Sequence, residues 1–211
     1  MKRTIEEHAA RFDDWAADYD EGERSEEYEA AVSLVLDHAA PAPDDTVLDL
    51  GTGTGVLALS LAGSADRVLG RDISQGMLET ARRKAQELGL ANVSFASGRF
   101  REPNVEDPVD VVVSNFAMHH LDDAEKAVAI DTIAALEPRR FVLGDVMFFG
   151  GPDPTEPFYD PEVDDPATVG VLVDALTSAG FAVTAVERVA DQVGVLVAER
   201  DIGNEDRASL Q

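Results

Sequence analysis

The sequence predicts a doubly wound α/β fold, with a mostly parallel sheet, helices on both faces and an antiparallel pair of strands at the C-terminal edge. Three observations predict it. Apolar segments alternate with helical patterns along most of the chain. A glycine-rich turn follows the first of these apolar segments and leads into a helix. The last two apolar segments are too close together to be joined by a crossover.

Five apolar segments are rich in valine, leucine and phenylalanine, which is typical of parallel strands that are buried on both faces. They are Thr46–Leu50, Arg67–Asp72, Val93–Ser97, Val109–Asn115 and Arg140–Phe149. Helical patterns lie before and between them, and several begin after a residue that can cap a helix. These capping residues are Ser25, Ser74 and Asp122.

The C-terminal part departs from this alternation. After a helix near Ala167–Ala179, the segments Phe181–Val189 and Val193–Arg200 are joined by Ala190, Asp191 and Gln192 alone. A parallel return needs about a dozen residues or more, so these two strands are expected to be antiparallel. A proline-rich stretch precedes the helix and leaves the carboxyl end of a strand, where ligands bind in such sheets.

Length and composition indicate one domain. The chain has 211 residues, 45% of them hydrophobic, and no cysteine. No apolar run approaches the roughly 20 residues of a membrane helix, and the N-terminal residues lack a signal-peptide core, so we expect a soluble cytoplasmic protein. Within the domain we expect a helical cap, a cofactor-binding core, a substrate-side loop, a final helix with the strand pair, and a tail. Their ranges are 1–40, 46–149, 150–166, 167–200 and 201–211.

The charge is strongly acidic and spread along the chain. Asp and Glu number 42 against 17 Lys and Arg, which gives a formal net charge of −25. An acidic coat with little lysine is typical of halophilic proteins, because molar salt screens repulsion between surface carboxylates. No basic groove is evident, so a nucleic-acid substrate is not expected.

The glycine-rich turn and an acidic residue together indicate a nucleoside-cofactor site. Gly51, Gly53 and Gly55 follow the strand Thr46–Leu50, and Asp72 ends the next strand. Glycine permits positive φ and close approach of a ligand, and the helix that follows directs unpaired N–H groups at it. A carboxylate in the place of Asp72 can accept both hydroxyls of a ribose.

Three further segments accompany this loop. They are FDDWAADYD at 12–20, LGRDISQGML at 69–78 and VVVSNFAMHHL at 111–121. With the G-x-G-x-G loop and the terminal antiparallel pair, the chain resembles the class I S-adenosylmethionine-dependent methyltransferases, whose fold is Rossmann-like. The likeness is strongest to the small-molecule group around the ubiquinone and menaquinone-type enzymes.

The resemblance implies S-adenosylmethionine as the cofactor, S-adenosylhomocysteine as the product and a small molecule as the methyl acceptor. The loop Gly51, Thr52, Gly53 and Gly55 would pass under the methionine part of the cofactor, with Asp49 near its amino group. Asp72 would hold the ribose. The other residues implied to contact the cofactor are Tyr19, Ile73, Met77, Gly98, Arg99, Phe100 and Asn115.

One residue departs from the family pattern. Family members usually carry an aspartate after Gly98, where it meets the adenine amino group, whereas this chain has Arg99 followed by Phe100. An arginine side chain cannot accept that hydrogen bond. The adenine would then depend on the backbone or on stacking against Phe100.

Methyl transfer requires a base only when the acceptor must lose a proton. His119 is the candidate catalytic residue that reaches the substrate, whereas His120 is expected to pack structurally against the glycine loop. We expect no metal site, because neighbours on a strand point to opposite faces and no third ligand is evident. His8 and His38 are expected on the surface or on helices.

Aromatic residues leave two interpretations open. Trp15 and Tyr19 are spaced i, i+4 and could close over the site or form the apolar face of a helix. The same choice, substrate pocket or core, applies to four aromatic residues near the proline-rich stretch. They are Phe148, Phe149, Phe158 and Tyr159.

Residues and motifs that are missing from the sequence narrow the range of possible reactions. Without cysteine, pyrimidine C5-methylation through a thiolate adduct is excluded, and the motif Ser114–Ala117 is not the Asn-Pro-Pro-Tyr type associated with amino groups of nucleobases or glutamine. A nicotinamide-dependent oxidoreductase is disfavoured by the glycine spacing. A binding module without catalysis remains an alternative, because of Arg99 and the lack of a decisive base.

Overall fold

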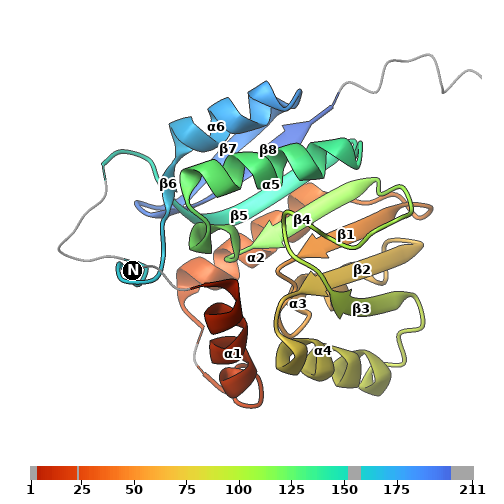
Figure 1. Cartoon of the computed structure of the whole chain (residues 1–211). Helices are drawn as coiled ribbons and strands as arrows, with labels where there is room; N and C mark the ends of the chain where they lie inside the picture. The colour runs from red at the N-terminus through yellow and green to blue at the C-terminus, as the bar shows by residue number, and fades with distance from the viewer. Residues whose placement is uncertain (1–3, 23, 152–157, 201–211) are drawn as a thin grey trace, which may run out of the picture.

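One mixed sheet runs through the centre of the computed structural model, with helices on both faces (Figure 1). The structure describes residues 4–22, 24–151 and 158–200. The strands lie in the order β3-β2-β1-β4-β5-β8-β7, and a short β6 pairs with β5. Their bounds are β1 Thr46–Leu50, β2 Arg67–Asp72, β3 Val93–Ser97, β4 Val111–Asn115, β5 Arg140–Phe148, β6 Ala167–Thr168, β7 Ala182–Ala190 and β8 Val193–Glu199.

The direction of the strands confirms the predicted fold class. The first five strands are parallel to one another, and β8 is antiparallel to both β5 and β7. The order in which the chain adds strands therefore reverses at β1, since β2 lies on one side of β1 and β4 on the other. In open α/β sheets ligands bind at the carboxyl ends of strands flanking such a point.

The helices form two layers. They are α1 Ile5–Trp15, α2 Glu26–Ala39, α3 Val56–Leu61, α4 Gln75–Glu87, the 3₁₀ turn η1 Met118–His120, α5 Asp123–Ala135 and α6 Val169–Ser178. Buried residues of α2, α3 and α4 form one core cluster with the sheet, and those of α5 and α6 form a second cluster on the other face. The α1 helix packs against α4 (Figure 1).

The predicted helix caps are confirmed. Ser25, Ser74 and Asp122 each accept a backbone N–H of the first turn of α2, α4 and α5. The last helix starts later than expected: Ala167 and Thr168 pair with β5 instead, and Thr168 caps α6.

Strand ends differ by one or two residues from the predicted ranges. The strand β4 begins at Val111 and not at Val109, and β5 ends at Phe148. Asp191 and Gln192 alone connect β7 to β8, as an antiparallel pair requires. Part of the predicted substrate-side loop, 152–157, and the predicted tail, 201–211, lie outside the described residues.

Among the described residues, no helix combines the length and apolar character needed to cross a membrane.

Candidate active site

The turn after β1 is built by glycines in the left-handed region. Gly51, Gly53 and Gly55 have φ of 72°, 52° and 89°. The N–H groups of Gly51 and Thr52 both donate to the carbonyl of Arg71, at 2.9 and 3.0 Å, which ties the turn to the end of β2. At Gly51 a Cβ would lie 2.3 Å from Cβ of Ala117, so the segment after β4 leaves room only for glycine. The turn thus brings together the ends of β1, β2 and β4.

Asp49 is buried beneath this turn. Its Oδ2 accepts the Thr52 hydroxyl at 2.6 Å and the backbone N–H of Ala58 at 3.2 Å. Burial raises the pKa of the Asp49 carboxyl to about 7, although these two hydrogen bonds oppose the shift. The carboxyl group is therefore close to half ionised at neutral pH.

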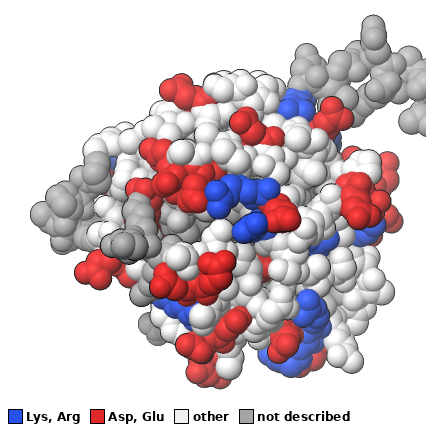
Figure 2. Space-filling model, viewed as in Figure 1, with Lys and Arg blue, Asp and Glu red and all other residues white. Residues whose placement is uncertain are grey.

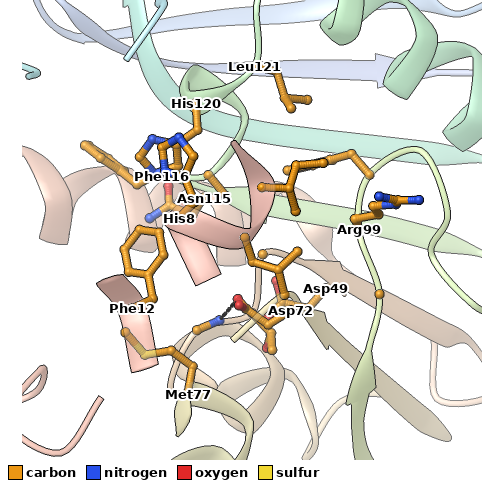
Figure 3. A pocket seen from close by; sticks show the side chains of 18 of the residues that line it. His8, Phe12, Asp49, Asp72, Met77, Arg99, Asn115, Phe116, His120 and Leu121 are labelled. Atoms are coloured by element: carbon orange, nitrogen blue, oxygen red, sulfur yellow. Dashed lines mark hydrogen bonds between the residues drawn. The ribbon is translucent and has the colours of Figure 1, made fainter. Parts of the chain in front are cut away.

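Asp72 faces the same turn from the end of β2 (Figure 3). Its two oxygens accept N–H groups of Gly53, at 2.8 Å, and Ser74, at 2.9 Å. Burial raises the pKa of Asp72 despite these bonds. The carboxylate is positioned by the backbone on both sides and borders the cavity described next.

A cavity of about 240 Å³ opens over the carboxyl ends of the strands. Twelve of the residues expected to contact the cofactor line it: Tyr19, Asp49, Gly51, Thr52, Gly53, Asp72, Ile73, Met77, Gly98, Arg99, Phe100 and Asn115. Gly55 lies just behind this lining, where it caps α3. His119 is also not a lining residue, whereas His120 is.

Asn115 is the most unusual polar group in the lining. It ends β4 and is 9% exposed, yet neither its Nδ2 nor its Oδ1 has a hydrogen-bond partner. The amide is packed closely on β5, since a Cβ at Gly144 would lie 2.3 Å from the Asn115 Oδ1. A buried amide without partners costs free energy unless a ligand satisfies it.

The N-terminal helix forms one wall of the cavity. Ile5, His8 and Phe12 of α1 line it. Asp13 anchors the helix, since its Oδ1 accepts the Ser74 hydroxyl at 2.5 Å and the Gly76 N–H at 2.9 Å. These hydrogen bonds lower the pKa of Asp13. The helix is thereby fixed to the first turn of α4, beside Asp72.

The structure places the residues of this segment about which the sequence left a choice. His8 lies on a helix, which is one of its two expected places, and it is 6% exposed and lines the cavity because α1 turns this face towards the strand ends. Trp15 is 46% exposed and lies under the Arg11 guanidinium, away from the lining. Tyr19 does line the cavity, but α1 ends at Trp15, so the two rings do not share a helix face.

Arg99 lines the cavity on the side opposite α1 (Figure 3). Its guanidinium forms an ion pair with Glu102 at 2.7 Å, and the backbones of the two residues also pair. The Glu102 carboxylate therefore neutralises part of the positive charge of the Arg99 guanidinium. Phe100, the next residue, also lines the cavity, as stacking against a planar base would need.

The two adjacent histidines reverse their expected positions. They lie in the 3₁₀ turn η1 and not on a strand, so their rings lie side by side with centroids 4.1 Å apart. His119 turns inwards, where its Nδ1 lies 2.5 Å from Oδ1 of Asp145. His120 faces the cavity, and its Nδ1 lies 2.7 Å from Oδ1 of Asp164. The structure thus differs from the expectation that His119 reaches the substrate and His120 is structural, because His120 and not His119 lines the cavity.

The same turn overturns the argument against a third ligand. Asp164 stands beside both histidines, and one ligand atom from each of the three residues lies within 4.8 Å of the others. Two of these residues are also joined to each other, because His120 Nδ1 and Asp164 Oδ1 form a hydrogen bond. The other Asp164 oxygen accepts the N–H of Asp160 at 2.9 Å.

The four aromatic residues near the proline-rich stretch do not line this cavity. Phe148 packs against Tyr159, with ring centroids 5.7 Å apart. Phe158 packs against Phe116, at 6.0 Å, and Phe116 lines the cavity. Phe158 therefore supports the wall of the cavity from behind, whereas Phe148 and Tyr159 pack on each other.

Comparison with known proteins places this geometry in a family. A family model described as a methyltransferase domain matches residues 47–138. A protein of Bacillus pumilus named an uncharacterized methyltransferase is 33% identical over 150 residues, which cover 67% of this chain and 68% of that protein. The chain belongs to the methyltransferase family. A similarly named protein of Oceanobacillus iheyensis is 34% identical over 65% of this chain. The alignments span 66%, 66% and 46% of the first curated relatives.

Solved structures confirm the methyltransferase fold. The [4+2]-cyclase SpnF matches with a TM-score of 0.80 at 16% identity, over 96% of this chain and 98% of its own. Magnesium protoporphyrin IX methyltransferase from Synechocystis, solved with bound S-adenosylhomocysteine, matches with a TM-score of 0.71 at 20% identity, over 91% and 95% of the two chains. Because one of these neighbours is named a cyclase, the fold also carries other reactions, and the reaction must be argued from the site.

Proposed function

We propose that this protein is an S-adenosylmethionine-dependent methyltransferase that transfers a methyl group to a small-molecule acceptor. The unpaired amide of Asn115, buried at the cavity that twelve of the expected residues line, is the observation that carries the proposal. A polar ligand in the cavity would satisfy that amide. The bound cofactor would supply a methyl group already activated on a sulfonium.

The residues present fit such a cofactor. Asp72 would hold the ribose hydroxyls with a carboxylate that the N–H groups of Gly53 and Ser74 keep in place. The Gly51–Gly55 turn would lie under the methionine part, and Asp49, when ionised, would attract its ammonium group. Ile73, Met77 and Phe100 offer apolar surface to the adenine. Arg99, paired with Glu102, would border this subsite without accepting a hydrogen bond.

Each part of the domain would have its own role in this function. Within 1–40, α1 would act as the cap, since it walls the cavity while α2 packs on the sheet. The range 46–149 would hold the cofactor, 150–166 would border the substrate side, and 167–200 would complete the sheet, with 201–211 as a tail. A small acceptor is consistent with the enclosed, partly aromatic wall formed by Phe12 and Phe116. The likeness of the 12–20, 69–78 and 111–121 segments supports the ubiquinone and menaquinone-type group.

Calorimetric titration of S-adenosylmethionine and S-adenosylhomocysteine in molar KCl tests the proposal. We expect both to bind, and Asp72→Ala to weaken binding by about 1.5–3 kcal/mol, or roughly 10- to 150-fold, because hydrogen bonds to a charged group are lost. Asp37→Ala, which removes an exposed carboxylate of α2, is the control and should bind as the wild type does. A folded wild type that binds neither compound would refute the proposal.

A further inference from the structure

His120 occupies the place in the cavity wall that a proton acceptor would need. It ends the turn η1 after β4 and lines the cavity, with 20% of its side chain exposed. His8 and Phe12 of α1 face it, with ring centroids at 5.0 and 5.6 Å (Figure 3). A ligand that fills the cavity would therefore be within reach of this imidazole.

The hydrogen bond to Asp164 selects the tautomer of His120. Burial would raise the pKa of Asp164, but the hydrogen bond from His120 and the charge of His119 lower it, so this carboxyl group is ionised at neutral pH. An ionised carboxylate can only accept. The Nδ1 of His120 must therefore carry the hydrogen, and in the neutral ring the lone pair is on Nε2. A second acceptor bond, from the Asp160 N–H to Asp164, holds the carboxylate in place.

Burial and the neighbouring His119 keep His120 neutral. Burial and the adjacent His119 lower the pKa of His120, against the opposing effect of Asp164 and Asp145. Burial alone would also lower the pKa of His119, but the Asp145 carboxylate raises it above its usual value. Of the two rings, the inner histidine therefore binds a proton more readily, and the outer one keeps a lone pair that can accept a proton.

Charged groups of both signs surround the two histidines, and Asp123 lies 3.5 Å from the Lys126 ammonium. Asp145 and Asp164 bring two negative charges, and the buried Lys126, which donates to the carbonyls of Leu121 and Asp165, brings one positive charge. The raised pKa of His119 favours a second positive charge on its ring. A divalent ion held by the Nε2 atoms of the two histidines would add positive charge close to the Lys126 ammonium, whose charge already lowers the pKa of His119.

We propose that His120, oriented by Asp164, is the general base that removes the proton from a hydroxyl group of the methyl acceptor. The inference rests on the proposed function. The oxygen of the acceptor forms a bond to the methyl carbon, the carbon–sulfur bond breaks with its electron pair remaining on sulfur, and the hydroxyl proton passes to Nε2 of His120. Asp164 stabilises the imidazolium that results, and the aromatic wall of Phe12 and Phe116 suits a planar acceptor such as a phenol.

Nitrogen NMR of the histidine rings tests this directly, because the chain has only four histidines. Protein labelled with ¹⁵N-histidine should show His120 as a neutral ring protonated on Nδ1 at neutral pH, and His119 as a charged ring. The signals are assigned with His120→Gln, and His38→Gln, at the far end of α2, is the matched control. In Asp164→Asn the Nδ1–H preference of His120 should be lost.

Turnover gives a second readout. Release of S-adenosylhomocysteine is measured with phenols, alcohols, tertiary amines and thioethers as acceptors. We expect hydroxyl compounds to be methylated, and His120→Gln to lose about 10²- to 10⁴-fold in rate with unchanged cofactor affinity. Methylation confined to tertiary amines or thioethers, which need no proton removal, would overturn the proposal.

Two other results would overturn it. One is an Nε2–H or charged His120 at neutral pH. The other is a shift of the His119 and His120 signals on adding Zn²⁺ or Mg²⁺ that His120→Gln abolishes, since this would identify a metal site. Calorimetry separates these failures from that of the proposed function: a wild type that binds S-adenosylmethionine with the wrong His120 tautomer refutes the base alone.

Discussion

His119 and Asp145 form a buried pair that holds the turn after β4 against β5. The Nδ1 of His119 lies 2.5 Å from Oδ1 of Asp145, and Oδ2 of the same carboxylate accepts the N–H groups of Met118 and His119 at 2.8 and 3.0 Å. One carboxylate thus fixes both the backbone of η1 and the ring of its central residue. Because His119 is held inwards, the next residue, His120, is left facing the cavity.

Replacement of Asp145 by asparagine should be strongly destabilising. The amide side chain would keep the size of the carboxylate but lose the charge that pairs with His119, in a site where Asp145 is 2% exposed. Removing one partner of a buried pair costs about 3–5 kcal/mol, so the free energy of unfolding should fall by that amount. Urea unfolding in molar KCl measures it. The exposed Asp131→Asn on α5 is the control, and equal losses in the two variants would contradict the role given to the pair.

The raised pKa of Asp49 predicts that its contribution to the free energy of unfolding decreases as the pH rises, which is opposite to the usual behaviour of an aspartate. Its pKa is raised from 3.8 to about 7 in the folded state, so folding favours the protonated carboxyl. The stability that this group contributes is complete below about pH 3.8 and is lost as the pH rises to about 7. A tenfold difference in proton affinity between the folded and unfolded states is worth about 1.4 kcal/mol, so the loss amounts to a few kcal/mol.

The measurement compares the wild type with Asp49→Asn. Groups such as Asp164, whose pKa is lowered, contribute with the opposite sign, and they are present in both proteins. The free energy of unfolding of the wild type, relative to the variant, should therefore decrease from pH 4 to pH 7. A difference that stays constant over this range would show that the pKa of the Asp49 carboxyl is the same in the folded and unfolded states.

The sheet, the helix caps and the glycine turn could be predicted because their signals are local. Valine-rich segments, a serine or aspartate before a helix, and the G-x-G-x-G spacing each act within a few residues. Thus β1, β2 and β3 have the predicted bounds, and Ser74 caps α4 as expected. Twelve of the residues predicted to contact the cofactor line one cavity for the same reason, since strand ends and turns are adjacent to these signals.

The roles of the histidines could not be predicted, because they depend on distant partners. Phe116 adopts a positive φ of 52°, which ends β4 and starts the 3₁₀ turn. The partners that then orient the two rings, Asp145 and Asp164, are 26 and 44 residues away in sequence. The burial of His8 likewise depends on the docking of α1 through Asp13 on Ser74. No spacing in the sequence reports these contacts.

The close approach of Gly51 to Ala117 predicts that adding a single methyl group at position 51 destabilises the protein. In Gly51→Ala the new methyl group would meet Cβ of Ala117 at 2.3 Å, and the φ of 72° disfavours any side chain. Steric and backbone strain of this kind costs about 1–3 kcal/mol each, so we expect a matching loss in the free energy of unfolding together with weaker cofactor binding. Gly63→Ala, where nothing lies within 4 Å of the new methyl group, is the matched control and should be close to neutral. A Gly51→Ala protein as stable as this control would mean that the segment after β4 moves freely.

The acidic surface predicts a stability that depends on salt. Acidic side chains are spread over the face shown in Figure 2, with basic ones interspersed among them, and the formal net charge is −25. The Debye length falls from about 30 Å at 0.01 M salt to about 3 Å at 1 M, so repulsion between these carboxylates is screened only at high salt. The melting temperature should therefore rise steeply between low and molar KCl, and NaCl of equal ionic strength should act alike. Sucrose, which stabilises proteins by exclusion from their surface and screens no charge, should not reproduce the rise. A melting temperature that is flat in KCl would refute the interpretation of the acidic surface as an adaptation to high salt.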